Sequence, residues 1–432
     1  MRNFGSQKRS PLGRLCIVLF AIALVGAVGC GGGVSASGPT PTPTPTPPQA
    51  TPTPTPLPAG TLEMKVLDTS VPPGGIFQWQ LSTTEPKPIG HGSTRPQIPP
   101  GPVRGVAIND PAGQAAGIAV VAPSGVGIQV TSPDNLFGTS LDYPVVTMSM
   151  PLSASLTPGT TSTIGIDTSN TSMFQDANTQ YTLLFAPGTL TIAPNGSPYI
   201  SDVIPGGGLL PDRTAIRVLG ANFNANTRVS IEGTTIVPAD STFVNSGEID
   251  VKICNGTVAD GAATCPNTGA TLQLDGERVR VKDQSTNFVI EYYTYLRTDD
   301  APGSSGNTLV TEVHPMFSRQ TYLAATIPLV NSGTQFTGLA LQNTSGTDDG
   351  IKVELLDANG ASLASPATFS FILPARNKIA RDVIKDWFSG TVPAGAAKVR
   401  MTVTSGNAPI QALGMLGDSS AGTVAPVIPQ QN

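Results

Sequence analysis

Cysteine and histidine are the residues of this chain best suited to covalent or metal chemistry, and both are scarce, with 4 cysteines and 2 histidines in 432 residues. Cys16 and Cys30 lie near the amino terminus, whereas Cys254 and Cys265 flank a short loop rich in Gly and Ala. A zinc site needs several Cys or His side chains close together. Because no such group accompanies these cysteines, we predict no metal site and no cofactor.

The two histidines also argue against nucleophilic catalysis. His91 lies in the loop-like stretch Gly90–Ser93, and His314 precedes Pro315. A catalytic triad aligns a histidine with a nucleophile and an orienting acid, and the chain contains no Gly-x-Ser-x-Gly nucleophile motif. We predict that both histidines are loop residues and that the protein has no catalytic residue.

Carboxylates leave one enzymatic alternative open. A pair of Asp or Glu side chains at a set separation suffices for glycoside hydrolysis, but the 29 acidic residues form no recognisable pattern. Asp357–Gly360 begins like a calcium loop, yet Thr368 stands where such a loop carries Glu. We therefore predict a tight Asn-Gly turn at this point and keep an uncharacterised glycoside hydrolase as an alternative.

The amino-terminal segment is typical of an exported protein. A basic opening precedes the apolar run Leu15–Gly29, which is too short to span a hydrocarbon core of about 30 Å and indicates a signal peptide over residues 1–29. Ala27–Cys30 resembles a bacterial lipobox, and the resemblance implies cleavage before Cys30 and lipidation of Cys30. Because several acyl chains anchor a protein stably, we expect a membrane partner through this lipid. Gly31 stands where Asp often retains lipoproteins at the inner membrane, which favours the outer membrane or the cell surface of a bacterial envelope.

Residues 30–60 are predicted to form a spacer. Gly31–Gly38 is small and flexible, and Pro39–Pro58 is dominated by Thr-Pro repeats. Proline fixes φ and removes a backbone donor, so we expect an extended polyproline II linker.

Export also changes the interpretation of the remaining cysteines. Disulfides form in oxidising compartments, cleavage removes Cys16, and lipidation occupies Cys30. We therefore predict a disulfide between Cys254 and Cys265, which a chain-entropy model values at about 3 kcal/mol.

Composition predicts an all-β fold after the linker. Charged residues make up 12% of the chain and hydrophobic residues 39%, with 47 Gly and 41 Pro, a balance typical of short strands joined by many turns. We expect three tandem β-sandwich modules, at residues 61–193, 198–297 and 309–426.

Alternation is clearest near the start of the first module. Phe77, Trp79 and Leu81 share one face of a predicted strand, and Gln78 and Gln80 share the other. The module also has an opening Val-Pro-Pro-Gly-Gly-x-Phe stretch, a Pro-Gly-Thr turn and a closing Pro-Gly-Thr-Leu-Thr-Ile strand. On these motifs it resembles a cohesin, of the carbohydrate-binding-module superfamily. The resemblance implies a β-sandwich that binds dockerin or polysaccharide.

The other two modules carry resemblances of their own. Gly220–Phe223 follows a predicted strand, and on this Gly-x-Asn-Phe motif the second module resembles an IPT/TIG domain, an immunoglobulin-like sandwich in which the glycine and Phe223 are structural. The third module resembles an uncharacterised C-terminal sandwich of acidobacterial exported proteins, which implies no activity.

Aromatic residues leave sugar binding undecided. Trp79 alternates with polar residues and is predicted to pack in a core, while Trp387 lies on the apolar face of the one predicted helix, Lys378–Phe388. Tyr293 and Tyr295 share a strand face, and both core packing and an exposed sugar platform stay open for them.

These features predict a non-catalytic, lipid-anchored surface protein that displays β-sandwich modules for adhesion or binding. The expected partner is a polysaccharide or another surface or exported protein, with the oligomeric state left open. The net charge of −5 argues against nucleic acid. A second alternative to this function is a cohesin-like scaffold that docks polysaccharide-degrading enzymes.

Overall fold

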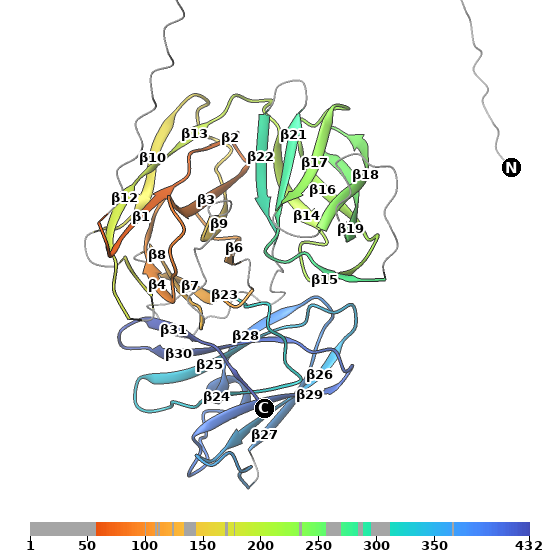
Figure 1. The fold of residues 1–432 in the computed structure, drawn as a ribbon. Helices are drawn as coiled ribbons and strands as arrows, with labels where there is room; N and C mark the ends of the chain where they lie inside the picture. The colour runs from red at the N-terminus through yellow and green to blue at the C-terminus, as the bar shows by residue number, and fades with distance from the viewer. Residues whose placement is uncertain are drawn as a thin grey trace, which may run out of the picture. The chain divides into compact units, whose positions relative to one another are not determined.

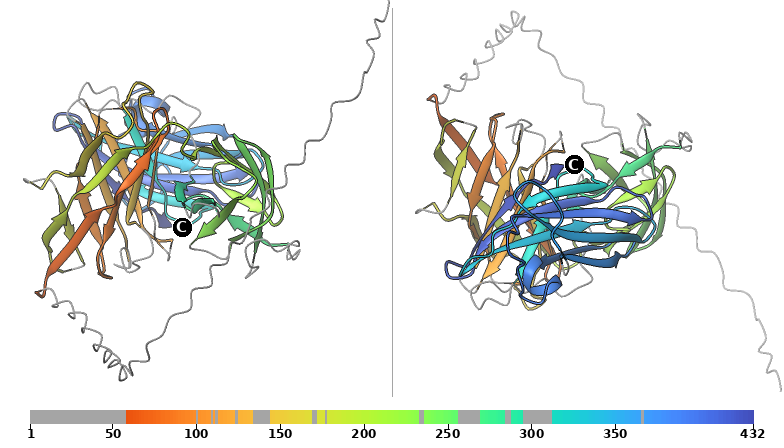
Figure 2. Two further views of the ribbon diagram at one scale, coloured as in Figure 1. Left: turned by 90° about the horizontal axis from the view of Figure 1, so that it is seen from above. Right: turned by 90° about the horizontal axis from the view of Figure 1, so that it is seen from below.

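The computed structural model describes residues 58–432 except 100, 109, 111–112, 123–124, 134–143, 169–171, 177, 233–235, 256–268, 284–287, 295–311 and 365–366. The regular secondary structure of the described part is almost entirely strand (Figures 1 and 2), and the predicted all-β fold is confirmed. Three β-sandwiches follow one another along the chain. They run from orange to yellow, through green, and from cyan to blue in Figure 1, and are called the first, second and third sandwich below.

The first sandwich contains three sheets. One has the order β12-β1-β3-β9-β6, with bounds Thr182–Ala186, Thr61–Val66, Ile76–Thr83, Val146–Pro151 and Gly105–Ile108. Another has the order β2-β13-β10-β5, with bounds Thr69–Val71, Gly188–Ile192, Thr161–Ile166 and Pro96–Gln97. The third has the order β11-β4-β8-β7-β23, with bounds Met173–Gln175, His91–Thr94, Gly125–Thr131, Ala116–Ala122 and Glu312–Met316.

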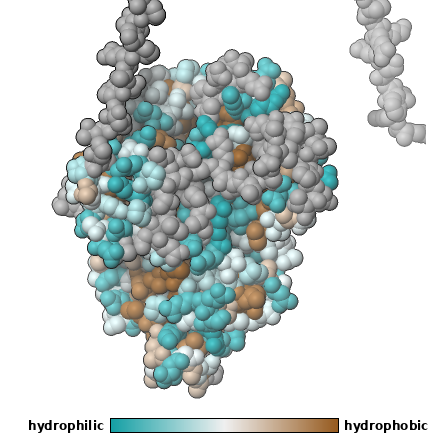
Figure 3. Space-filling view, in the orientation of Figure 1, coloured by the Kyte–Doolittle hydropathy of each residue, from teal (hydrophilic) through white to brown (hydrophobic). Residues whose placement is uncertain are grey.

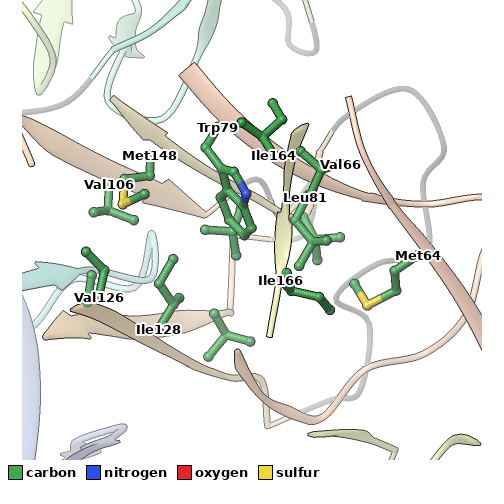
Figure 4. Close-up of a cluster of buried hydrophobic side chains, with 14 of the residues drawn as sticks. Met64, Val66, Trp79, Leu81, Val106, Val126, Ile128, Met148, Ile164 and Ile166 are labelled. Atoms are coloured by element: carbon green, nitrogen blue, oxygen red, sulfur yellow. The ribbon is translucent and has the colours of Figure 1, made fainter. Parts of the chain in front are cut away.

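One hydrophobic core joins these sheets. Phe77, Trp79 and Leu81 of β3 are fully buried, as their alternation predicts, and Figure 4 shows Trp79 and Leu81 among the other core side chains. Burying each such side chain contributes roughly 1.5–3 kcal/mol. The indole nitrogen of Trp79 also donates a hydrogen bond to the carbonyl oxygen of Gly165 in β10, at 3.0 Å. The prediction that Trp79 packs in a core is confirmed.

Strand β23 connects distant parts of the chain. It pairs antiparallel with β7, with Val313 opposite Val120 and His314 opposite Ala119. The segment that leads into the third sandwich therefore completes a sheet of the first sandwich before it enters its own.

The second sandwich has two main sheets around one core. The first, β14-β16-β19-β18, has bounds Tyr199–Ile204, Ala215–Ala221, Glu248–Asn255 and Ile236–Asn245. The second, β17-β21-β22, has bounds Thr227–Glu232, Arg278–Asp283 and Phe288–Tyr293. A two-stranded sheet pairs β15, Leu209–Pro211, with β20, Thr271–Gln273.

The Gly-x-Asn-Phe motif has a clear steric basis in this sandwich. A Cβ on Gly220 would overlap the carbonyl oxygen of Tyr199 and the ring of Phe223. Phe223 is buried, and Asn222 adopts a left-handed φ of 61°, a conformation that Asn tolerates better than most residues. The glycine and the phenylalanine are thus structural, and the IPT/TIG assignment itself stays a prediction.

The third sandwich also has two sheets around its own core. One, β27-β26-β29-β24-β32, has bounds Thr368–Leu373, Asp349–Leu356, Lys398–Ser405, Ala324–Pro328 and Gln430–Gln431. The other, β28-β25-β30-β31, has bounds Lys378–Asp382, Gln335–Gln342, Gln411–Asp418 and Thr423–Val427.

The helix predicted over Lys378–Phe388 is wrong in its first part. Lys378–Asp382 is the edge strand β28, which pairs with β25, and only Val383–Trp387 is helical, as a short π-helical turn, η1. The Asp382 carboxylate accepts hydrogen bonds from the backbone nitrogens of Ile384 and Lys385, at 3.1 and 3.0 Å. This capping by Asp382 fixes where the strand ends and the helical turn begins.

Candidate functional site

A groove of about 430 Å³ lies between the first and second sandwiches. Its lining comes from β2, β3 and β13 on one side and from β14, β21 and β22 on the other, and Figure 1 places β22 beside β2 and β3. Sites for small ligands are typically concave and measure about 300–1,000 Å³. The groove is therefore large enough to hold a ligand rather than only water.

Gln78 joins the two walls of the groove. Only 5% of this residue is exposed. In the orientation that satisfies both ends of its amide, the side-chain nitrogen donates to the carbonyl oxygen of Glu291, and the side-chain oxygen accepts from the backbone nitrogen of Tyr293, both at 3.0 Å. The amide thus satisfies backbone groups of β22 that no further strand pairs with, since β22 is an edge strand of its sheet.

Glu291 is the charged centre of the groove. One carboxylate oxygen lies 3.2 Å from Nε of Arg280 and 3.9 Å from a terminal guanidinium nitrogen of Arg278. The other oxygen accepts a hydrogen bond from the Gln80 side chain of the first sandwich, at 3.4 Å. The guanidinium of Arg280 and the amide of Gln80, from two different sandwiches, thus both lie within 3.4 Å of the Glu291 carboxylate.

A further contact outside the groove joins the same two sandwiches. Arg104 donates to the carbonyl oxygen of Ser201 at 2.9 Å and to the Asp202 carboxylate at 3.2 Å. The other oxygen of Asp202 accepts from the Tyr292 hydroxyl at 3.3 Å. These contacts and those of Gln78 and Gln80 connect the first sandwich to the second.

A smaller cavity, of about 40 Å³, is lined by residues of all three sandwiches. Lys378, one of the lining residues, is 6% exposed. Burial lowers the pKa of its ammonium group, while the Asp275 carboxylate opposes that shift. Gln342 donates to Asp275 at 2.9 Å and to the side-chain oxygen of Gln411 at 2.6 Å. This cluster has room for a few water molecules and joins the second sandwich to the third.

The predicted modification sites lie at or beyond the limits of the described residues. Cys30 lies outside them, and so does Cys265. Cys254 is fully buried near the end of β19. Lipidation of Cys30 and the disulfide between Cys254 and Cys265 therefore stay predictions.

The two histidines lie in strands, so the prediction of loop positions is wrong. His91 begins β4, and burial lowers the pKa of its imidazole. His314 is buried in β23 of the same sheet, and strands β8 and β7 separate it from β4. The local sequence around each histidine suggests a turn, whereas pairing with distant strands makes both positions extended. Among the described residues, no group of three or more His, Cys, Asp and Glu side chains could hold a metal ion.

The turn predicted at Asp357–Gly360 is confirmed. The Asp357 carboxylate accepts from the backbone nitrogens of Asn359 and Ala361, each at 2.8 Å, and Gly360 has a φ of 87°. The turn connects β26 to the segment that leads to β27, and the carboxylate oxygen is used by the turn itself.

The aromatic residues considered for a sugar platform are mostly internal. Tyr293 is 1% exposed, so core packing is confirmed for it, and Tyr295 lies outside the described residues. Trp387 is also buried, with its ring 5.5 Å from that of Phe371 and 6.1 Å from that of Phe369 between centroids.

The groove was missed by the sequence reasoning. Alternation marks Gln78 and Gln80 only as the polar face of a strand, and no local pattern connects either of them with Arg280. The sequence does contain one indication of the groove. Gln78 and Gln80 lie on the opposite face of the strand from its core residues, and an uncharged polar face of this kind can be covered by another module. Their partner Glu291 lies far away in sequence, so local patterns do not bring them together.

No helix in the part of the chain that the structure describes has the length and apolar character needed to cross a bilayer.

No protein-family model matches the chain, and no curated protein matches it. Among solved structures, it is similar to the third cohesin of ScaC from Acetivibrio cellulolyticus, solved with a ScaB dockerin, at 16% identity and a TM-score of 0.26, covering 31% of this chain and 100% of that one. The chain is also similar to a cohesin in a cohesin–dockerin complex from Clostridium thermocellum, at 16% identity and a TM-score of 0.26, covering 31% of this chain and 99% of that one. A third similar structure is a non-cellulosomal cohesin from Archaeoglobus fulgidus, at 12% identity and a TM-score of 0.26, covering 31% of this chain and 92% of that one. These structural neighbours are cohesins, and each likeness covers less than a third of this chain.

Proposed function

We propose that the protein is a non-catalytic binding lipoprotein of the bacterial cell envelope. In this account Cys30 carries the lipid, the Thr-Pro segment spaces the protein from the membrane, and the three sandwiches bind a polysaccharide of the envelope or of the surroundings. The observation that carries the proposal is the groove of about 430 Å³, with polar groups from two sandwiches gathered at Glu291.

The character of the described surface supports a role in water. On the face drawn in Figure 3, hydrophilic side chains predominate among the described residues, and hydrophobic ones form separate patches. Polysaccharide recognition needs hydrogen-bonding groups held at fixed positions, because hydroxyl groups in water already have partners and only well-placed groups can replace them.

The binding proposal is tested with the full chain in detergent, on affinity gels cast with neutral and acidic polysaccharides and with a gel lacking polysaccharide as control. We expect at least one polysaccharide to slow the migration of the protein. The chain length of that polysaccharide should be unchanged after incubation with the protein. Loss of chain length would show hydrolysis and favour the glycosidase alternative. Absence of retardation in every gel would contradict polysaccharide binding.

The location is tested separately by metabolic labelling with a palmitate analogue. We expect label in the native chain and in the membrane fraction, and loss of both in Cys30→Ala. Equal labelling and fractionation of the two chains would contradict the lipid anchor.

A further inference from the structure

We infer that the groove between the first and second sandwiches binds an uncharged, hydroxyl-rich oligosaccharide segment. This inference rests on the proposed function and specifies its ligand class and site. Among the described residues that line the groove, the charged groups are the guanidinium of Arg280 and the carboxylates of Glu291 and Asp68. Because Arg280 is already paired with Glu291, the groove offers a phosphate or polyuronate no unopposed cation.

The polar groups suit hydroxyl groups instead. A hydroxyl donates one hydrogen bond and accepts others, and the groove combines an acceptor, Glu291, with donors on Arg280 and Gln80 within 3.4 Å of that carboxylate. Neighbouring hydroxyls on a sugar ring can therefore donate to the carboxylate and accept from the guanidinium or the amide. Hydrogen bonds to charged partners are the stronger ones and give such a site selectivity.

The rest of the lining matches the other surfaces of a sugar. Thr69, Ser70 and Thr191 add hydroxyl groups from the two adjacent strands β2 and β13, which pair in parallel. Ile76 and Ile290 add apolar surface, against which the C–H groups of a sugar ring can pack. Polar groups for orientation combined with apolar area for contact are the usual composition of a small-ligand site.

Contacts between the two sandwiches also hold the walls of the groove in place. Gln78 bridges to the backbone of β22 at 3.0 Å, and Arg104 bridges to Ser201 at 2.9 Å. A site whose walls are already connected loses less conformational entropy on binding, which favours affinity for a flexible oligosaccharide.

The test titrates the full chain with cello-, manno- and xylo-oligosaccharides, with oligogalacturonate as the anionic comparison and an unrelated peptide as control. Ser70→Trp places a large side chain at an exposed position in the lining, and Glu291→Gln removes the carboxylate charge while keeping the side-chain shape. Ser162→Trp, at an exposed position on β10 of the same sheet and outside the lining, is the matched control. Thermal unfolding of each variant shows whether it is folded.

We expect a neutral oligosaccharide to bind, both groove variants to weaken it by about tenfold or more, and Ser162→Trp to bind like the native chain. If Glu291→Gln unfolds, Ser70→Trp alone decides. Tighter binding of oligogalacturonate or of the peptide would overturn the ligand class. Polysaccharide retention that is unaffected by both groove variants would overturn the site and leave the proposed function standing, whereas no retention of any polysaccharide by the native chain would overturn both.

Discussion

The joint between the first and third sandwiches differs in kind from the joint between the first and second. In the former, Ala116 and Ile118 of β7 and Val313 of β23 pack with Leu413 and Met415 of β30 in one hydrophobic cluster. In the latter, hydrogen bonds and the ion pair between Arg104 and Asp202 connect the two sandwiches beside a groove. Apolar packing stabilises the folded chain by removing apolar surface from water. Polar groups that border an open groove can form hydrogen bonds with a ligand. The difference supports the proposal made above, in which the apolar joint stabilises the fold and the polar joint binds the ligand.

The largest loss of stability is expected from a substitution in the apolar joint. Leu413 is fully buried, so Leu413→Ala should lower the free energy of unfolding by about 3 kcal/mol through lost contacts and a residual cavity. Urea unfolding measures the change. Leu323→Ala, at a residue that is 54% exposed, is the control and should change stability by less than about 0.5 kcal/mol. Equal effects at the two positions would contradict the stabilising role of the apolar joint.

The polar cluster around Lys378 should make stability depend on pH. Burial lowers the pKa of Lys378 below its usual 10.5. At a pH between the pKa of the folded chain and that of the unfolded chain, the unfolded chain therefore binds a proton that the folded chain lacks. Stability from this group therefore rises with pH across that window. Lys378→Met lacks this contribution. The free energy of unfolding of the native chain, minus that of the variant, should therefore rise by at most about 1.4 kcal/mol per pH unit in this window. Parallel stability curves for the two chains would contradict the burial of a charged ammonium group.

The smallest effect is expected at the polar joint itself. Arg104→Ala removes the contacts to Ser201 and Asp202, and because the side chain is partly exposed to solvent the loss should be only about 1 kcal/mol. Urea unfolding again provides the measurement. Lys87→Ala, which removes a pair with Glu85 inside the first sandwich, should change stability little. A loss at Arg104 as large as that at Leu413 would show that the polar joint also holds the fold together.

The strands were predictable because their signals are local. Phe77, Trp79 and Leu81 alternate with glutamines, and a period of two residues puts all three on one buried face. The helix at Lys378–Phe388 was mispredicted because Ile379 and Val383 fit a helical face, while the first residues of the segment form an edge strand fixed by pairing with β25.

The joints were not predictable in the same way. The pairing of Val313 with Val120 joins residues far apart in the chain, and no local pattern encodes such a register. The groove likewise draws on Ser70, Thr191 and Glu291 from three separate stretches. Sequence periodicity tells which side of a strand is apolar, but not which module covers its polar side.

The central claim is tested most directly by hydrogen–deuterium exchange of the full chain, with and without the cello-, manno- and xylo-oligosaccharides. We expect bound oligosaccharide to slow amide exchange in peptides that cover β2, β3 and β22, and to leave β7, β23 and β30 unchanged. Slowed exchange confined to β7, β23 and β30, with none at the groove, would contradict the assignment of the polar joint as the binding site.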